Sequence, residues 1–136
     1  MRTVLVTGVS TGIGKSIAEE LLKNNFYVIG SVRKEEDAKH LSENFPNKFK
    51  SVIFDVTDYK SIEDSKSRVK DIIKSNNSYL CSIINNSGIA LGGPVQYLDL
   101  EIFKKQFDVN YFGLISVTKI FLDLLIESNT RPLKNK

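Results

Sequence analysis

Short apolar runs alternate along the chain with segments in which apolar residues recur every three or four positions. The runs are rich in valine and isoleucine and are typical of buried strands, whereas the periodic segments are typical of amphipathic helices. Strands are predicted at residues 3–7, 27–32, 51–54 and 80–84, and helices at residues 13–22, 35–45, 58–73 and 99–126, with Thr57 or Asp58 as the N-cap of the third helix.

This fourfold alternation of strand and helix predicts an α/β fold, with one parallel sheet covered by helices on both faces. Short, right-handed connections place the strands in the order 3-2-1-4, which gives a Rossmann-like, doubly wound sheet of about four strands followed by the long helix. At 136 residues the chain has room for one domain. We expect a nucleotide-binding half-domain over residues 1–127 and a polar tail over residues 128–136.

Three glycines, Gly8, Gly12 and Gly14, stand between the first predicted strand and the first predicted helix. Because they lack Cβ atoms, they let the backbone come close to a ligand. The free N–H groups in the first turn of the following helix point at any anion bound there. The segment therefore predicts a site for the phosphates of a nucleotide.

Composition and charge argue against several other functions. The net charge of +3 comes from scattered lysines without an aromatic-interleaved basic face, so no nucleic-acid partner is expected. Cys81 is the only cysteine, which rules out an intrachain disulfide and fits a cytoplasmic protein. We find no signal-peptide pattern, no apolar run long enough to span a bilayer and no metal-ligand spacing, so we expect neither a membrane nor a metal as partner.

The glycine-rich segment alone fits two kinds of nucleotide site. Gly14, Lys15 and Ser16 resemble the end of a phosphate-binding P-loop, although Val9 stands where the standard P-loop has glycine. In a variant loop similar to that of dethiobiotin synthetases, Lys15 would neutralise phosphates, Ser16 would hold Mg²⁺ and Asp55 would be a second metal ligand. In a dinucleotide loop, Lys15 and Ser16 are ordinary residues of the first helical turn.

Four motifs in sequence order resemble those of the short-chain dehydrogenase/reductase family and favour the dinucleotide loop. They are Thr7-Gly8-x-x-x-Gly12-x-Gly14 after the first strand, Asp55 at the end of the third, Asn85-Asn86-Ser87-Gly88 after the fourth, and Phe107-Asp108-Val109-Asn110 in the long helix. Ser87 replaces the alanine usual in the family, which is a small-for-small change. The stretch from Gly92 to Asn110 also resembles retinol- and hydroxysteroid-type members.

The resemblance implies a site for a nicotinamide dinucleotide and the residues that form it. Asp55 and the backbone of Val56 would meet the adenine ring, and the turn after the fourth strand would lie against the cofactor. Asn110 would take the place of the helix asparagine that orders a catalytic water chain, and it is the one catalytic element of the family in this sequence. The implied cofactor-binding residues are Gly8, Ser10, Thr11, Gly12, Ile13, Gly14, Arg33, Asp55, Val56, Asn86, Ser87 and Gly88.

The end of the second predicted strand favours NADP(H) over NAD(H). Folds that bind NAD place a carboxylate there for the ribose hydroxyls, whereas a basic residue accommodates the 2′-phosphate of NADP. Residues 31–34 offer no acid, and Arg33 can form a charge-assisted fork on a phosphate. Ser10 would add a hydroxyl donor to the same phosphate.

The family's catalytic Tyr-x-x-x-Lys pair is absent from these 136 residues, since none of the tyrosines at positions 27, 59, 79, 97 and 111 has lysine four positions later. The resemblance therefore implies the truncated, cofactor-binding portion of an oxidoreductase that transfers hydride between NADP(H) and a small alcohol or carbonyl substrate. This portion alone is expected to be inactive. A non-catalytic NADP-binding or oligomerisation module is the second hypothesis, and a variant P-loop enzyme acting on ATP is the third.

Two surfaces are expected to promote self-association. The strand at residues 80–84 has an open edge, and the long helix at residues 99–126 carries apolar residues that lack a partner.

Several other residues are expected to have structural and not functional roles. His40 is expected on the surface, and Cys81 is expected to pack as a small hydrophobe. The helical spacing of four aromatic residues predicts that they lie in the core: Phe103, Phe107, Tyr111 and Phe112.

Overall fold

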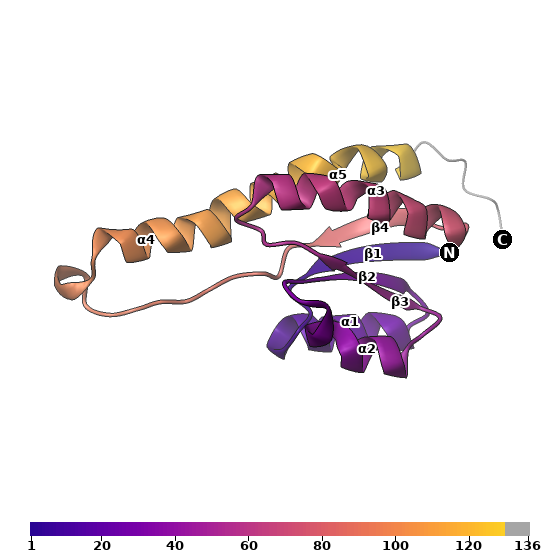
Figure 1. Cartoon of the computed structure of the whole chain (residues 1–136), viewed down its shortest axis with the longest axis horizontal. Helices are drawn as coiled ribbons and strands as arrows, with labels where there is room; N and C mark the ends of the chain where they lie inside the picture. Colours follow the sequence, from indigo (N-terminus) through magenta and orange to yellow (C-terminus); the bar gives the residue numbers. More distant parts are fainter. Residues whose placement is uncertain (130–136) are drawn as a thin grey trace.

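The computed structural model describes residues 1–129 and contains one four-stranded parallel sheet (Figure 1). The sheet order is β3-β2-β1-β4, and its strands are β1 (Arg2–Thr7), β2 (Tyr27–Val32), β3 (Phe49–Ile53) and β4 (Tyr79–Ile84). The predicted α/β class and the predicted order 3-2-1-4 are therefore confirmed. Because all three pairings are parallel, the carboxyl ends of the four strands lie at the same edge of the sheet.

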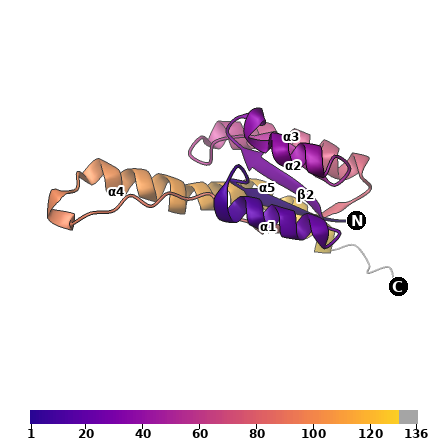
Figure 2. The same cartoon turned by 90° about the horizontal axis from the view of Figure 1, so that it is seen from below.

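Helices cover both faces of this sheet. One face carries α1 (Gly12–Lys23), the 3-10 helix η1 (Glu35–Ala38) and α2 (Lys39–Asn44), and the other carries α3 (Tyr59–Ser75) and α5 (Leu114–Asn129) (Figure 1 and Figure 2). Alternate residues of β1 supply the two cores. Val4 and Val6 belong to the cluster that contains Leu22 of α1, whereas Leu5 belongs to the cluster that contains Phe121 of α5.

Local sequence signals explain where α3 begins and ends. Asp58 is its N-cap, and a carboxylate oxygen of Asp58 accepts a hydrogen bond from the Ser61 N–H at 3.1 Å. After the helix, Asn77 takes a left-handed conformation with φ 45°, which asparagine tolerates better than most residues. Of the two predicted N-caps, Thr57 and Asp58, the structure therefore selects Asp58.

The helix predicted at residues 35–45 is two short pieces, η1 and α2. Its buried apolar residues, Ala38 and Leu41, are three positions apart. Ala38 is the last residue of η1 and Leu41 lies in α2, and both belong to the core cluster that contains Val32 of β2 and Phe49 of β3.

The helix predicted at residues 99–126 is continuous but irregular. After a short 3-10 turn, η2 (Val95–Tyr97), it consists of α4 (Leu100–Phe107), the π-helix η3 (Asp108–Gly113) and α5. Gly113 in η3 lies against Val56, where an added Cβ would be 2.9 Å from the Val56 Cγ2 atom. The wide π turn therefore lies where the helix meets the loop after β3.

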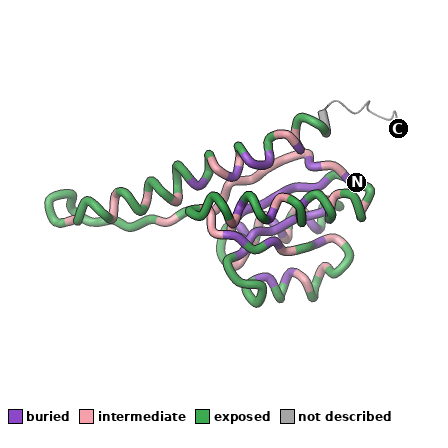
Figure 3. Tube along the Cα trace, turned by 45° about the horizontal axis from the view of Figure 1, so that its top comes forward, coloured by how far each residue is buried: buried purple, intermediate pink, exposed green. Residues whose placement is uncertain are grey.

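Only the second half of this long helix lies over the sheet, and α4 projects beyond it (Figure 1 and Figure 3). The prediction of a core role is consequently wrong for Phe107, Tyr111 and Phe112, which are 59%, 53% and 56% exposed. The sequence showed helical spacing but not which turns of the helix have a sheet beneath them. The Tyr111 ring instead contacts the other two, Phe107 at 6.2 Å between centroids and Phe112 edge to face at 5.2 Å.

The helical segment Leu100–Glu127 is, among the described residues, the one whose length and composition would allow it to cross a membrane. The prediction that no apolar run is long enough for this was therefore wrong. Such a segment is also typical of core helices, and α5 packs on the sheet through Val117, Phe121 and Leu124. α5 ends at Asn129, and residues 130–136 of the expected polar tail lie outside the described residues.

Candidate functional site

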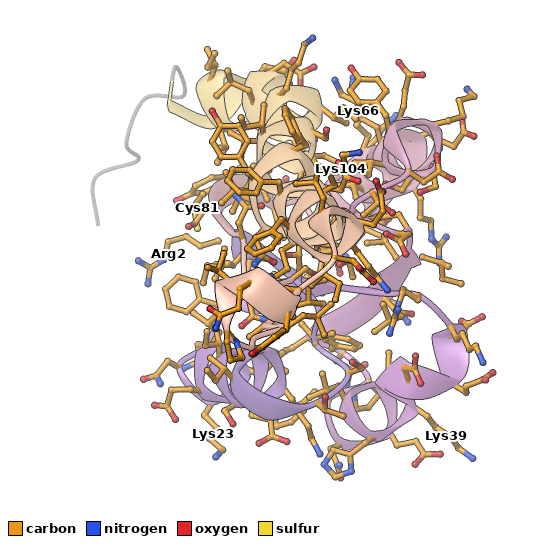
Figure 4. The ribbon with its side chains drawn as sticks, turned by 90° about the vertical axis from the view of Figure 1, so that its left-hand side faces the viewer. Arg2, Lys23, Lys39, Lys66, Cys81 and Lys104 are labelled. Carbon is orange, nitrogen blue, oxygen red and sulfur yellow. The ribbon has the colours of Figure 1, made fainter. Side chains whose placement is uncertain are left out.

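The candidate site lies at the carboxyl ends of the strands, where the loops after β1, β2, β3 and β4 converge. Figure 4 views the molecule from this end, with α4 and Lys104 toward the viewer. Loops at this edge of an open α/β sheet are where ligands bind, since neighbouring strands diverge there into helices on opposite faces. The residues implied by the family resemblance come from all four of these loops.

The glycine-rich loop begins against the end of β2. The N–H groups of Gly8 and Val9 both donate to the carbonyl oxygen of Ser31 at 3.1 Å, and the Gly8 N–H also approaches the Ser31 Oγ at 3.2 Å. Gly8 and Gly12 have left-handed backbones, with φ 70° and 59°, which glycine adopts at little cost. These contacts fix the start of the loop and turn the chain into α1.

Two of the glycines serve the packing of the loop on its neighbour. An added Cβ at Gly8 would lie 2.7 Å from the Ser87 Oγ, and one at Gly14 would overlap the Gly8 carbonyl oxygen and the Asn86 side chain. At Gly12 an added Cβ would meet nothing within 4 Å. Close approach of a ligand is therefore only part of the reason that these positions are glycine. Gly8 and Gly14 are also required for contact between the loop and the turn after β4.

The N-terminus of α1 is open toward the site. Its N-cap residue, Thr11, makes no side-chain hydrogen bond to the helix. Ser10 is half-buried, and Thr11 and Ile13 are exposed, with Ile13 at 75%. The N–H groups of the first turn have no acceptor within the helix itself, so this end offers donors and a partial positive charge to an anion.

The turn after β4 is fixed to β1 by a compact set of hydrogen bonds. The Asn86 side chain donates to the carbonyl oxygens of Thr7, at 2.9 Å, and Gly8, at 3.1 Å. The backbone N–H groups of Asn86 and Ser87 donate to the Thr7 Oγ1 at 3.0 and 2.9 Å. Gly88 is exposed and follows directly. Asn86, Ser87 and Gly88 are thereby brought beside Gly8.

Asn85 points to the other side of this turn. Its side-chain N–H donates to the Thr118 Oγ1 of α5 at 3.0 Å, and that hydroxyl donates to the Leu114 carbonyl oxygen at 2.9 Å. The Asn85 Oδ1 is the buried side-chain oxygen without a hydrogen-bond partner among the described residues. Thr118 was missed by the sequence reasoning, and nothing in its local pattern would have indicated it.

Asn110 reaches the chain directly after the turn. Its Oδ1 accepts from the Ile89 N–H at 2.8 Å, and its Nδ2 donates to the Ile89 carbonyl oxygen at 2.7 Å. Gly88 lies alongside, where an added Cβ would be 3.3 Å from the Asn110 Oδ1. The structure therefore brings the candidate residue of the long helix to the same loop as Asn86 and Ser87.

Arg33 and Asp55 lie at the ends of β2 and β3. A carboxylate oxygen of Asp55 accepts from the Thr57 Oγ1 at 2.7 Å and from the Thr57 N–H at 2.9 Å. The Thr57 hydroxyl is the main reason that the pKa of Asp55 is lowered; burial opposes this, and the Thr57 N–H and the positive charge of Arg33 add to it. Arg33 is exposed and Val56 is half-buried against Gly113.

The residues of the P-loop alternative are engaged elsewhere. The Ser16 hydroxyl donates to the Gly12 carbonyl oxygen at 3.2 Å, and the Lys15 Nζ is 3.9 Å from a carboxylate oxygen of Glu19. His40 is exposed, as expected, with its Nε2 3.5 Å from the same Glu19 carboxylate. In the part of the chain that the structure describes, no three His, Cys, Asp or Glu side chains are grouped as metal ligands.

A parallel sheet with a glycine-rich turn between β1 and α1 is typical of nucleotide-binding α/β proteins. The family model for short chain dehydrogenase matches residues 2–131, so the chain belongs to the short-chain dehydrogenase/reductase family, whose members are NAD(P)-dependent oxidoreductases. This membership decides between the two interpretations of the glycine-rich loop in favour of the dinucleotide loop.

Three similar proteins show how much of this chain, and how much of each relative, the similarity covers. The NADPH-dependent 3-dehydrocapnine reductase of Ornithobacterium rhinotracheale is 41% identical over 136 residues, which are 100% of this chain and 47% of that protein. Estradiol 17-beta-dehydrogenase 2 of Rattus norvegicus is 34% identical over 96% of this chain and 34% of its own length, which confirms the resemblance to hydroxysteroid-type members. The structure of NADPH-bound carbonyl reductase from chicken fatty liver aligns with a TM-score of 0.80 and 27% identity, over 91% of this chain and 51% of that chain. The chain thus spans 34% to 49% of the length of the first curated relatives it matches.

Proposed function

We propose that this chain is the NADP(H)-binding portion of a short-chain oxidoreductase that acts on an alcohol or carbonyl substrate. The observation that carries the proposal is the position of the glycine-rich loop beside the end of β2, where residues 31–34 contain an arginine and no acid. Arg33 follows the last residue of β2, and Gly8 at the start of the loop is bonded to Ser31 two positions earlier. A basic residue at this place accommodates the 2′-phosphate of NADP.

The residues present fit a dinucleotide. The open first turn of α1 and the left-handed Gly12, with free space around it, provide a cradle for the pyrophosphate. Arg33, with Ser10, would hold the 2′-phosphate, and Asp55 with the backbone of Val56 would meet the adenine. Asn86, Ser87 and Gly88 would lie along the rest of the cofactor. When bound, the cofactor supplies hydride transfer, and this chain's residues bind and orient it.

We do not propose turnover for these 136 residues by themselves. The 136 residues hold no Tyr-x-x-x-Lys pair to donate and accept the substrate proton. We therefore propose binding of NADP(H) without turnover by this chain alone. A non-catalytic NADP-binding module is the second candidate, and the same missing pair favours it. If the chain is the cofactor-binding portion of an oxidoreductase, we expect turnover once the catalytic half of the fold is supplied. If the chain is a non-catalytic module, we expect no turnover.

The deciding experiment is to titrate the purified chain with NADPH and with NADH and to monitor binding by the fluorescence of the cofactor. We expect NADPH to bind at least about tenfold more tightly, because a charge-assisted hydrogen bond contributes about 1.5–3 kcal/mol. Arg33→Ala should remove most of that preference. Lys34→Ala is the matched control, since Lys34 is the neighbouring exposed cation, and it should leave the preference intact. Equal affinity for both cofactors, or an unchanged preference in Arg33→Ala, would contradict the proposal.

A cytoplasmic setting is also proposed. It is supported by the single cysteine, which needs no oxidising compartment. Burial raises the pKa of the Cys81 thiol, which keeps it protonated and unreactive at neutral pH. Fractionation of cells that express the tagged chain would test this, and recovery in the membrane or secreted fraction would contradict it.

A further inference from the structure

The long helix makes a second contact of the same type one helical turn before Asn110. The Gln106 Oε1 accepts from the Leu91 N–H at 3.0 Å, and the Gln106 Nε2 donates to the Leu91 carbonyl oxygen at 2.8 Å. Asn110 does the same to Ile89, at 2.8 and 2.7 Å. Each side-chain amide therefore occupies both backbone groups of one residue, as a neighbouring strand would. We refer to Gln106 and Asn110 with their two backbone partners as the amide clamp.

The spacing of the amide clamp matches helix to extended chain. Residues four apart on a helix are separated by about 6 Å along its axis, because the rise is about 1.5 Å per residue. Residues two apart on an extended chain are separated by about 6.6 Å. Ile89 and Leu91 are two apart in a segment without regular secondary structure, and Gln106 and Asn110 are four apart. Successive amides on one helix face therefore meet alternate residues of the segment.

Few other interactions hold this part of the molecule. No residue of α4 is buried, so burial of apolar side chains does not fix α4 to the sheet in this chain. The segment after Gly88 is exposed or half-buried throughout. The turn before it is anchored to β1 through Asn86 and Thr7. The amide clamp is thus the anchor on the far side of Gly88, and the two anchors together define where Ser87 and Gly88 lie.

We propose that Gln106 is a positioning residue for the cofactor site, which holds the chain after Gly88 through Leu91 and so keeps the turn Asn86–Gly88 in its binding position. This inference rests on the proposed function, since it concerns binding of NADP(H) by that same turn. It requires a neutral amide at position 106. Only a group that donates and accepts at once can satisfy both the N–H and the carbonyl of Leu91.

The test compares Gln106→Ala and Gln106→Glu with Lys105→Ala as control, since Lys105 is the exposed neighbour on α4. Backbone hydrogen exchange of the whole chain, followed by NMR, reports the clamp directly. In Gln106→Ala we expect Leu91 N–H exchange to rise at least about tenfold, the size of effect that corresponds to about 1.4 kcal/mol. Exchange of the core residue Ile29 should not change. Unchanged exchange at Leu91 would overturn the inference.

Binding of NADP⁺ provides the functional readout. We expect Gln106→Ala to weaken it about three- to tenfold and Lys105→Ala to leave it unchanged. Gln106→Glu should bind as weakly as Gln106→Ala at pH 7.5, since a carboxylate accepts but cannot donate. At pH 4.5 the introduced carboxyl is partly protonated and both donates and accepts, so part of the affinity relative to wild type should return. Gln106→Ala should show no such recovery, whereas a loss of helix stability alone would affect both variants alike.

The outcomes separate the inference from the function on which it rests. If the wild-type chain binds no NADP⁺, the proposed function fails and the positioning role fails with it. The wild-type chain could bind NADP⁺ while Gln106→Ala exchanges faster at Leu91 and binds NADP⁺ as tightly as wild type. In that case the amide clamp is only structural, and this inference alone is overturned. The same holds if Gln106→Glu shows no recovery of affinity at pH 4.5.

Discussion

Asn86 bonds twice to Thr7, the last residue of β1: its N–H donates to the Thr7 Oγ1 at 3.0 Å and its Nδ2 to the Thr7 carbonyl oxygen at 2.9 Å. The Nδ2 also donates to the carbonyl oxygen of Gly8 at 3.1 Å. One side chain thus ties the end of β1, the first glycine of the loop and the turn after β4. Two of the site's loops are therefore held together by hydrogen bonds within the protein.

Asn86→Asp should destabilise the chain by about 2 kcal/mol, because the introduced carboxylate cannot donate to two carbonyl oxygens and leaves them unpaired. The change preserves the size and shape of the side chain, so the effect reports the lost donors. Urea unfolding at pH 7 measures it. Asn47→Asp, at an exposed residue, is the control and should cost no more than about 0.5 kcal/mol. Equal stability of the two variants would show that the Asn86 amide is dispensable.

Alanine substitution should distinguish the roles of three glycines. Gly14→Ala should cost about 1–3 kcal/mol, since its methyl group would overlap the Gly8 carbonyl and the Asn86 side chain. Gly12→Ala has free space and should cost only about 1–2 kcal/mol, from its left-handed backbone. Gly92→Ala meets neither obstacle and is the control. Urea unfolding of the three variants provides the comparison, and a Gly14→Ala protein as stable as Gly92→Ala would contradict the packing argument.

The sequence was sufficient to predict the sheet and the strand-end loops, because both depend on local patterns. The alternation of apolar runs and periodic segments predicts the order β3-β2-β1-β4, and Gly8, Gly12 and Gly14 mark the loop between β1 and α1. Asp55 and Asn86 each follow a predicted strand, so parallel strands bring them to one edge. Their roles toward a cofactor stay predictions.

The features that were missed depend on contacts between distant parts of the chain. The π turn at Asp108–Gly113 forms where Gly113 meets Val56 and Asn110 meets Ile89, and helical periodicity alone contains neither contact. Gln106 had one local signal, its position four residues before Asn110. Without the extended segment beside the helix, that spacing indicates only a shared helix face.

The stability contributed by Asp55 should depend on pH. Its pKa in the folded state is lowered, first by the Thr57 hydroxyl. The hydrogen-bonded carboxylate therefore stabilises the fold above the unfolded-state pKa, and this contribution is lost as the pH falls through the lower folded-state pKa. Thr57→Val should raise the pKa of Asp55 toward its ordinary value, so the stability difference from wild type should be present at pH 7 and shrink in acid.

NMR titration of the Asp55 carboxyl carbon, with urea unfolding at several pH values, checks this prediction. Thr57→Ser keeps a hydroxyl and is the control, with a pKa for Asp55 close to that of wild type. The stability difference between Thr57→Val and wild type could instead be constant from pH 7 into the acid range. That result would show that replacing the Thr57 hydroxyl with a methyl group changes stability through packing and not through the Asp55 carboxylate.

The exposed apolar residues of the long helix should cause self-association at high concentration. Phe112 and Ile115 are 56% and 43% exposed and lie three residues apart, and exposed apolar patches on a helix commonly form protein interfaces. Sedimentation velocity of the wild-type chain should show dimers or larger species. Phe112→Lys combined with Ile115→Lys should give a monomer with an unchanged circular dichroism spectrum, since neither side chain belongs to the core.

Tyr97→Lys is the control, because Tyr97 is 80% exposed but lies outside the helix, in η2. A wild-type chain that stays monomeric at high concentration, or a control that disperses the complex equally well, would argue against an interface on this helix.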